Sequence, residues 1–188
     1  MKKMLKKMMI IGLILVGSLT TTANADILKM SNNDEQLTNF ESNLPSRLQN
    51  ELLKMKEIKI MYGNEFYDTL ESYNVYNECV GNTIMNNYTK DIFIYVQYDC
   101  DTNREYSTFV HELFHGIDYL YGYTKDEEFV DIYMEEKGFF QDNYFNNNIM
   151  EFFAESGAWY VSSEQTKEQL KNECPMTYTY IENILNNK

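Results

Sequence analysis

The chain has little of several residue types, and each shortage narrows what the protein can be. Its 188 residues include two histidines, two prolines and one tryptophan, and 16 lysines and arginines are outnumbered by 29 aspartates and glutamates. This excess of negative charge makes nucleic acid and anionic membrane surfaces poor partners. The three cysteines form no CxxC pair, so a thiolate metal site has little support.

The odd number of cysteines leaves at least one of them unpaired. Cys79 and Cys100 fall on segments that the pattern below predicts as neighbouring strands, so one interpretation is a disulfide between them. The other interpretation makes each cysteine, Cys174 included, a small buried thiol.

The first 25 residues have the three parts of a secretory signal. Four lysines open the chain, an apolar run from Met8 to Leu19 follows, and Ala23 and Ala25 flank a cleavage site. The run is about a dozen residues long, short of the roughly 20 that span a bilayer, which argues against the alternative of a retained membrane anchor. We therefore expect a signal peptide over residues 1–25 and a secreted, extracellular bacterial protein. Loss of four of the 16 basic residues leaves 12 against 29 acidic ones, a net charge of −17.

The remaining residues, about 160, suit one domain with one core. Apolar residues at helical spacing predict a helix over 107–121, with Ser107 as its cap and Gly122 as its stop. The acidic run 126–128 is expected to be a solvated loop. The predicted order is helix 45–55, a strand at 58–60, a hairpin of strands 79–87 and 91–99, then helices 107–121, 150–161, 163–171 and 177–186. The fold class is therefore α+β, with a mixed N-terminal part containing a small sheet and an all-helical C-terminal part.

The stretch FVHELFHGIDYLYG, residues 109–122, holds both histidines four positions apart, with a glutamate directly after the first. Residues at this spacing lie about 6 Å apart on one helix face, so His111 and His115 can offer two nitrogens to one ion. Glu112 lies one position round the helix, where it can take a proton from an attacking water. The alternative is a helix whose histidines stay solvated. Two histidines placed at random fall four apart in roughly one case in a hundred, which favours a zincin-type active-site helix with one Zn²⁺ per chain.

A catalytic zinc site uses three protein ligands and leaves a fourth position for water. Since no histidine remains, the third ligand is expected to be a carboxylate. Glu151 and Glu155 lie four apart in NYFNNNIMEFFAESGAWYV, residues 143–161, on a predicted buried helix. Buried carboxylates need a charge partner: zinc for Glu151, and the ring N–H of a ligand histidine for Glu155. Asp118, one turn after His115, could serve a histidine in the same way. For Glu155 and Asp118 the alternative is a solvated face.

Three motifs together resemble one known family. HELFHGIDY, a tyrosine seven positions before EFFAE, and ECPMTYTYIENIL near the end are similar to the zinc peptidase domain of anthrax lethal factor and its small secreted relatives, among them the clostridial Pro-Pro endopeptidases. The resemblance runs from about Leu44 to Leu185. It implies that Glu151 is the third zinc ligand, that Glu155 supports a ligand histidine, and that Tyr144 donates a hydrogen bond to the oxyanion.

Tyr144 is assigned by the resemblance alone, because the chain has 16 tyrosines. A phenol aimed at the oxygen that becomes negative would stabilise the transition state more than the ground state. The chain departs from the family at Phe114, where members often carry glycine, so packing behind the zinc is expected to differ. Nothing in the chain corresponds to the domains with which lethal factor enters host cells, which favours an extracellular substrate.

We therefore expect residues 26–188 to form a single zinc metallopeptidase domain that hydrolyses peptide bonds of extracellular or cell-surface proteins. It is expected to be a monomer that binds a protein or peptide substrate. If strand 91–99 is a sheet edge beside the site, it would bind substrate as an added strand; its alternative role is ordinary sheet packing. Two functional alternatives stay open: a Pro-Pro-specific endopeptidase acting on bacterial surface adhesins, and a secreted binding module that keeps the fold without hydrolysing anything.

Overall fold

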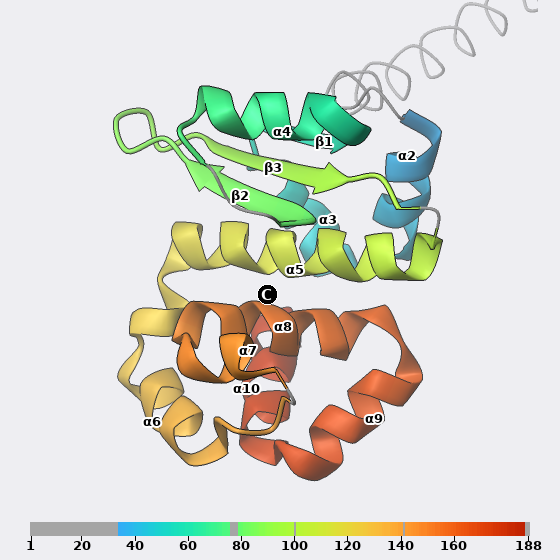
Figure 1. The fold of residues 1–188 in the computed structure, drawn as a ribbon. Coiled ribbons are helices and arrows are strands. Elements are labelled where there is room, and N and C mark those ends of the chain that lie inside the picture. Colours follow the sequence, from blue (N-terminus) through green and yellow to red (C-terminus); the bar gives the residue numbers. More distant parts are fainter. Residues whose placement is uncertain (1–33, 76–78, 100, 141, 187–188) are drawn as a thin grey trace, which may run out of the picture.

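The computed structural model describes residues 34–75, 79–99, 101–140 and 142–186. The predicted signal peptide lies outside the described residues. Within the described part, no helix combines the length and the apolar character needed to cross a bilayer. The long helix α5 (Thr102–Tyr121) lies between a sheet-containing part and a helical part (Figure 1).

A three-stranded sheet forms the first part. Its order is β1 (Glu57–Met61), β3 (Ile92–Gln97) and β2 (Gly81–Met85). β3 pairs in parallel with β1 and antiparallel with β2. The expectation that segment 91–99 could form the sheet edge is therefore wrong, because β1 occupies the outer side of β3. The edge strand on the side of the hairpin is β2.

The sheet is covered on both faces, by α4 (Gly63–Ser72) on one and by α5 on the other (Figure 1). Side chains of β3 alternate between two environments, as they do in a strand that is covered on both faces. Ile92, Ile94 and Val96 belong to the main core, whereas Tyr95 packs with Phe66 of α4 in a smaller cluster. Two further helices, α2 (Asp34–Asn43) and α3 (Ser46–Leu52), add apolar side chains to the main core.

Helix α5 begins earlier than its apolar stripe suggests. Its N-cap is Asp101 rather than Ser107, and the Asp101 side chain accepts hydrogen bonds from the backbone N–H groups of Asn103 and Arg104. The first turn is polar and so gave no apolar signal. The end was predicted correctly: Gly122 adopts the left-handed conformation, with φ of 71°, that favours glycine.

The rest of the described chain is helical, as predicted. The acidic run 126–128 is not a loop: Asp126 caps α6, and the two glutamates lie in its first turn, where the helix dipole favours negative charge. The elements after α5 are a short 3₁₀ turn (Tyr123–Lys125), α6 (Glu127–Glu136), α7 (Asn143–Asn147), α8 (Ile149–Ser162), α9 (Glu164–Glu173) and α10 (Pro175–Asn186).

Helix α8 lies directly against α5, with an aromatic ring facing a glycine. A Cβ atom added to Gly157 of α8 would lie 2.3 Å from two ring carbons of Phe114. Phe114 is fully buried and also makes an edge-on contact with Phe153. Absence of a side chain at Gly157 therefore lets α8 approach the bulky Phe114 of α5.

Two cysteines lie in the described part, and both are free thiols. Cys174 is buried, as expected of a small core residue, whereas Cys79 is half-buried. Cys100 lies outside the described residues.

Candidate metal centre

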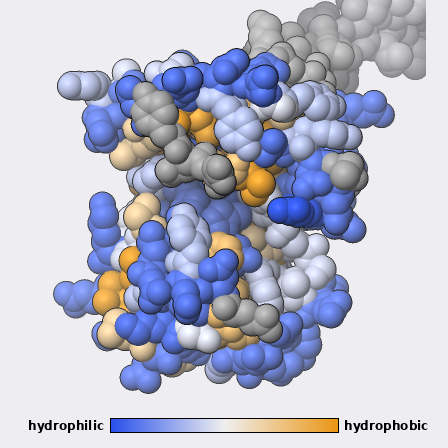
Figure 2. All heavy atoms as spheres, in the orientation of Figure 1, coloured by the Kyte–Doolittle hydropathy of each residue, from blue (hydrophilic) through white to orange (hydrophobic). Residues whose placement is uncertain are grey.

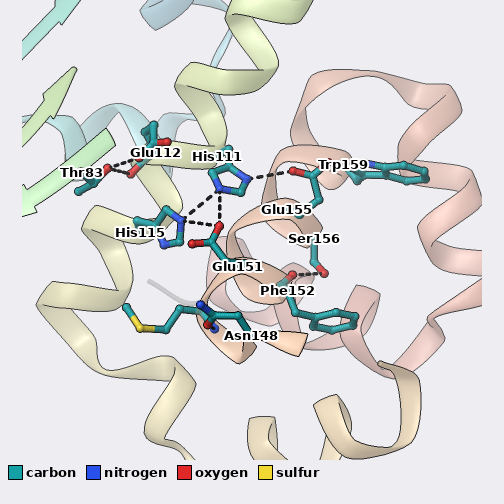
Figure 3. Close-up of polar contacts among 11 residues, drawn as sticks. Thr83, His111, Glu112, His115, Asn148, Glu151, Phe152, Glu155, Ser156 and Trp159 are labelled. Atoms are coloured by element: carbon teal, nitrogen blue, oxygen red, sulfur yellow. Dashed lines mark hydrogen bonds and ion pairs between the residues drawn. The ribbon is translucent and has the colours of Figure 1, made fainter. Parts of the chain in front are cut away.

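The two histidines and Glu151 meet between α5 and α8 (Figure 3). The Nε2 atoms of His111 and His115 are 3.1 Å apart. The Glu151 Oε2 atom lies 3.2 Å from the first of these nitrogens and 3.3 Å from the second. Three potential ligand atoms from two helices therefore form a nearly equilateral triangle.

The size of this triangle fits zinc. Bonds of about 2.0 to 2.1 Å at a tetrahedral angle place two ligand atoms roughly 3.3 Å apart. The three observed separations, 3.1 to 3.3 Å, lie at or just below this value. Two imidazole nitrogens and one carboxylate also match the donor set of catalytic zinc sites. Among the described residues, these three form the one group of histidine, cysteine or acidic side chains close enough to share an ion.

Glu155 orients His111 by contacting Nδ1, the ring nitrogen that is not part of the triangle. Its Oε2 atom is 2.9 Å from His111 Nδ1, and its Oε1 atom accepts a 2.9 Å hydrogen bond from the indole N–H of Trp159. A proton on Nδ1 leaves the His111 Nε2 lone pair free for an ion. Glu155 is therefore held from both sides, and Figure 3 shows it on the same face of α8 as Glu151. Glu155 therefore does not lie on a solvated face, which was the alternative expectation for this residue.

The triangle concentrates negative and positive charge in a small buried volume. Burial lowers the pKa of His111, but hydrogen bonds to Glu151 and Glu155 outweigh it and raise that pKa to about 10. Burial would raise the pKa of Glu151, but hydrogen bonds to His111 and His115 hold it well below its usual range. The site therefore favours a positive charge between its three groups, which a divalent cation supplies in place of a proton.

Glu112 lies beside the triangle, wedged between α5 and β2. Glu112 is 6 % exposed, and its Oε2 atom accepts a 2.7 Å hydrogen bond from the hydroxyl of Thr83. Burial raises the pKa of the Glu112 carboxyl, and the charges of the two histidines and the Thr83 hydrogen bond oppose that rise. A carboxylate with such a balance can accept a proton and release it again.

Tyr144 lies at the start of α7, where Asp142 caps the helix by accepting a hydrogen bond from the Tyr144 N–H. Tyr144 is 59 % exposed and borders the same cleft as the triangle. Burial of its inner part and a side-chain hydrogen bond to Glu151 raise the pKa of the phenol. The phenol therefore stays protonated and able to donate.

Asp118 was expected to support a histidine, but its carboxylate binds Thr124 instead. Asp118 is 4 % exposed, so it does not lie on a solvated face either. Its two carboxylate oxygens accept 2.7 Å hydrogen bonds from the N–H and the hydroxyl of Thr124. Asp118 thereby ties the end of α5 to the turn that follows it.

A cleft of about 1230 Å³ opens onto these groups, and Figure 2 shows the surface hollowed between the two parts of the molecule. One wall is formed by residues 79–83 at the start of β2, and the opposite wall by α7 and the start of α8. Analysis of the sequence missed Thr83 and Gly81. Their spacing of two on a predicted strand indicates a shared face, but nothing in the sequence shows that this face contacts Glu112.

Comparison with known proteins agrees with this arrangement. The family model for the N- and C-terminal domains of anthrax toxin lethal factor matches residues 16–184. A Pro-Pro endopeptidase of Clostridioides difficile (strain 630) is 36% identical over 78 residues, which make up 40% of this chain and only 36% of that protein. The solved structure of the Pro-Pro endopeptidase from Paenibacillus alvei shares the fold, with a TM-score of 0.62 at 19% identity, over 84% of this chain and 99% of that one. The α+β architecture and the match over most of the sequence confirm the predicted resemblance: the chain belongs to the anthrax toxin lethal factor family.

Proposed function

We propose that the protein is a secreted zinc-dependent endopeptidase that hydrolyses peptide bonds of extracellular or cell-surface proteins. The observation that carries the proposal is the triangle of His111, His115 and Glu151, whose sides match tetrahedral zinc coordination and which opens onto a cleft. Membership of the lethal factor family supports it.

Each neighbouring group has a role in peptide hydrolysis. A zinc ion held by the triangle would supply Lewis acidity, which lowers the pKa of water and polarises the scissile carbonyl. Glu112 takes a proton from the attacking water and delivers it to the leaving amine. Tyr144 donates a hydrogen bond to the carbonyl oxygen as negative charge develops on it, which favours the transition state over the substrate.

The edge strand β2 is the surface on which the substrate main chain would lie. In the described part of the chain β2 pairs with β3 alone, and residues 80–83 border the cleft. An extended peptide added to this edge gains main-chain hydrogen bonds with little dependence on its sequence. Side-chain pockets along the cleft would then decide which peptides are cleaved.

A narrower candidate is cleavage between consecutive prolines in bacterial surface adhesins. It is favoured by the match to a protein described as a Pro-Pro endopeptidase, which is 36% identical in the matched segment. Proline lacks a backbone N–H and holds a fixed backbone angle, so such a substrate is rigid and would need a cleft of matching shape.

A peptide library with cleavage sites identified by mass spectrometry tests both candidates. The zinc-loaded protein should cleave, and the chelator-treated protein should not, until zinc is restored. Replacement of Glu112 by glutamine should leave zinc binding within about twofold and lower kcat by at least about 100-fold, because only the proton transfer is lost. Glu164→Gln, an exposed substitution on α9, is the matched control. A zinc-loaded wild-type protein that cleaves no peptide would instead indicate a binding module.

A further inference from the structure

We propose that Thr83 is a positioning residue for the general base. Its hydroxyl, presented by the edge strand β2, holds one carboxylate oxygen of Glu112 and thereby fixes the direction in which the carboxylate faces the metal centre. This inference rests on the proposed function, in which Glu112 transfers the proton.

The contact is doubly anchored (Figure 3). Thr83 Oγ1 lies 2.7 Å from Glu112 Oε2 and 2.8 Å from the main-chain oxygen of the same residue. A hydroxyl carries one proton, which these two acceptors share, and the charged carboxylate is the stronger of them. One hydroxyl therefore contacts both the main chain and the carboxylate of Glu112, which restricts the rotatable bonds of the side chain to a small set of conformations.

Gly81 supplies the other half of this arrangement. It lies two positions before Thr83, on the same face of β2. A Cβ atom at Gly81 would lie 2.6 Å from Glu112 Oε1, 2.7 Å from its Cγ and 2.8 Å from Thr108 Cγ2. The carboxylate therefore packs against β2, with one oxygen held by Thr83 and the other beside the bare backbone of Gly81.

Because Glu112 is buried, the hydrogen bond from Thr83 is important for keeping its carboxylate charged. Glu112 is 6 % exposed, and a carboxylate removed from water needs donors to offset the loss of its hydration. Among the described residues, Thr83 is the side chain that donates a hydrogen bond to it. Valine has the shape of threonine without the hydroxyl, so Thr83→Val should preserve the strand and release the carboxylate.

Substitutions at Thr83 can distinguish two roles of its hydroxyl: orientation of the Glu112 carboxylate, and a purely structural contact between β2 and α5. Hydrogen bonds to charged groups contribute enough to predict a fall in kcat of about 10- to 100-fold for Thr83→Val. The KM and the zinc affinity should stay within about twofold, because the substitution leaves the main chain of β2 unchanged and Glu112 does not bind the ion. Thr83→Ser, which keeps the hydroxyl, should retain at least about a third of the wild-type kcat. Thr89→Val, in the exposed hairpin turn, is the matched control.

A readout without activity comes from crystal structures of the metal-free variants. Glu112 should occupy one conformation in the wild type and in Thr83→Ser, and several in Thr83→Val. An unchanged single conformation in Thr83→Val, or a wild-type kcat in that variant, overturns the inference. So does a loss of kcat that Thr83→Ser fails to restore. If the wild-type protein cleaves no peptide, the proposed function fails, and the Glu112 conformations still decide whether Thr83 positions that side chain.

Discussion

Replacement of Gly157 by alanine should disturb the metal centre without touching any ligand. The new methyl group would lie 2.3 to 2.5 Å from three carbons of the Phe114 ring. Carbon atoms in contact normally lie about 3.5 to 4.0 Å apart, so the ring or helix α8 must move by roughly 1 Å. Because Phe114 is fully buried, the ring has little room to move, and α8 should take up part of the shift.

Two opposing effects set the size of the change in stability. Alanine favours a helix over glycine by about 1 kcal/mol, whereas overpacking a buried contact costs about 1 to 3 kcal/mol or more. With the methyl group more than 1 Å too close, the overpacking cost should dominate, and we expect a net loss of about 1 to 2 kcal/mol in the free energy of unfolding. Metal ligands tolerate errors of only about 0.2 Å, so displacement of Glu151 with α8 should weaken zinc binding at least about tenfold.

Urea unfolding of the metal-free protein and zinc titration against a competing chelator measure the two effects. The matched control is the same substitution in a Phe114→Leu background, where the smaller side chain leaves space for the methyl group. In this background Gly157→Ala should lower the free energy of unfolding and the zinc affinity by less than half as much as it does in the wild type. A double-mutant cycle quantifies the difference. The reasoning is refuted if Gly157→Ala alone binds zinc as tightly as the wild type and is also more stable.

Three further predictions concern single groups at the site. Tyr144→Phe should lower kcat by about 100-fold or more with zinc affinity unchanged, because one donor to the oxyanion is lost; steady-state kinetics and metal titration check it, and an unaltered kcat contradicts the role. Glu155→Gln should weaken zinc binding about 10- to 100-fold. It should also change the fluorescence of Trp159, because the indole N–H of Trp159 donates a hydrogen bond to the Glu155 carboxylate. Equal affinity in a chelator competition would count against this support. In the metal-free protein, the pKa of His111 rises from about 6.5 unfolded to about 10 folded, so its contribution to stability is complete below about pH 6.5 and is lost as the pH rises toward 10. Zinc-loaded protein should lack this decline, because metal binding requires the neutral imidazole; unfolding curves from pH 6 to 10 compare the two forms, and a flat profile without metal would show the raised pKa to be wrong.

Features that depend on neighbours in the sequence could be predicted from it. The spacing of His111 and His115 fixes their common face on any helix, and Gly122 ends that helix through its own backbone preference. Alternation along a strand likewise places neighbours such as Ile94 and Tyr95 on opposite faces, and in β3 these two belong to different hydrophobic clusters. Asp101 was missed because a cap acts through one side chain and leaves no apolar period.

Features that depend on the order of strands in the sheet could not be predicted from the sequence. A predicted hairpin has two outer sides, and either strand could have been the edge beside the site. The pairing of β1 with β3 decides the question, and it joins Ile58 to Ile94 across a long stretch of chain. Assignment of Tyr144 had a similar limit, since the chain has 16 tyrosines and the folded cleft is lined by Tyr67 and Tyr119 as well as Tyr144.

The proposed metal centre and its proposed general base depend on two different interfaces of α5. Contact with α8, through Phe114 and Gly157, sets the distance between the histidines and Glu151, whereas contact with β2, through Thr83, sets the direction of Glu112. Because Glu112 and Phe114 are two positions apart on α5, they point to nearly opposite sides of the helix, and the first contact should be alterable without the second. Gly157→Ala should therefore weaken zinc binding while the zinc-saturated enzyme keeps much of its kcat, and Thr83→Val should do the reverse. In the double variant the two losses should be additive, since distant contacts without shared partners act independently.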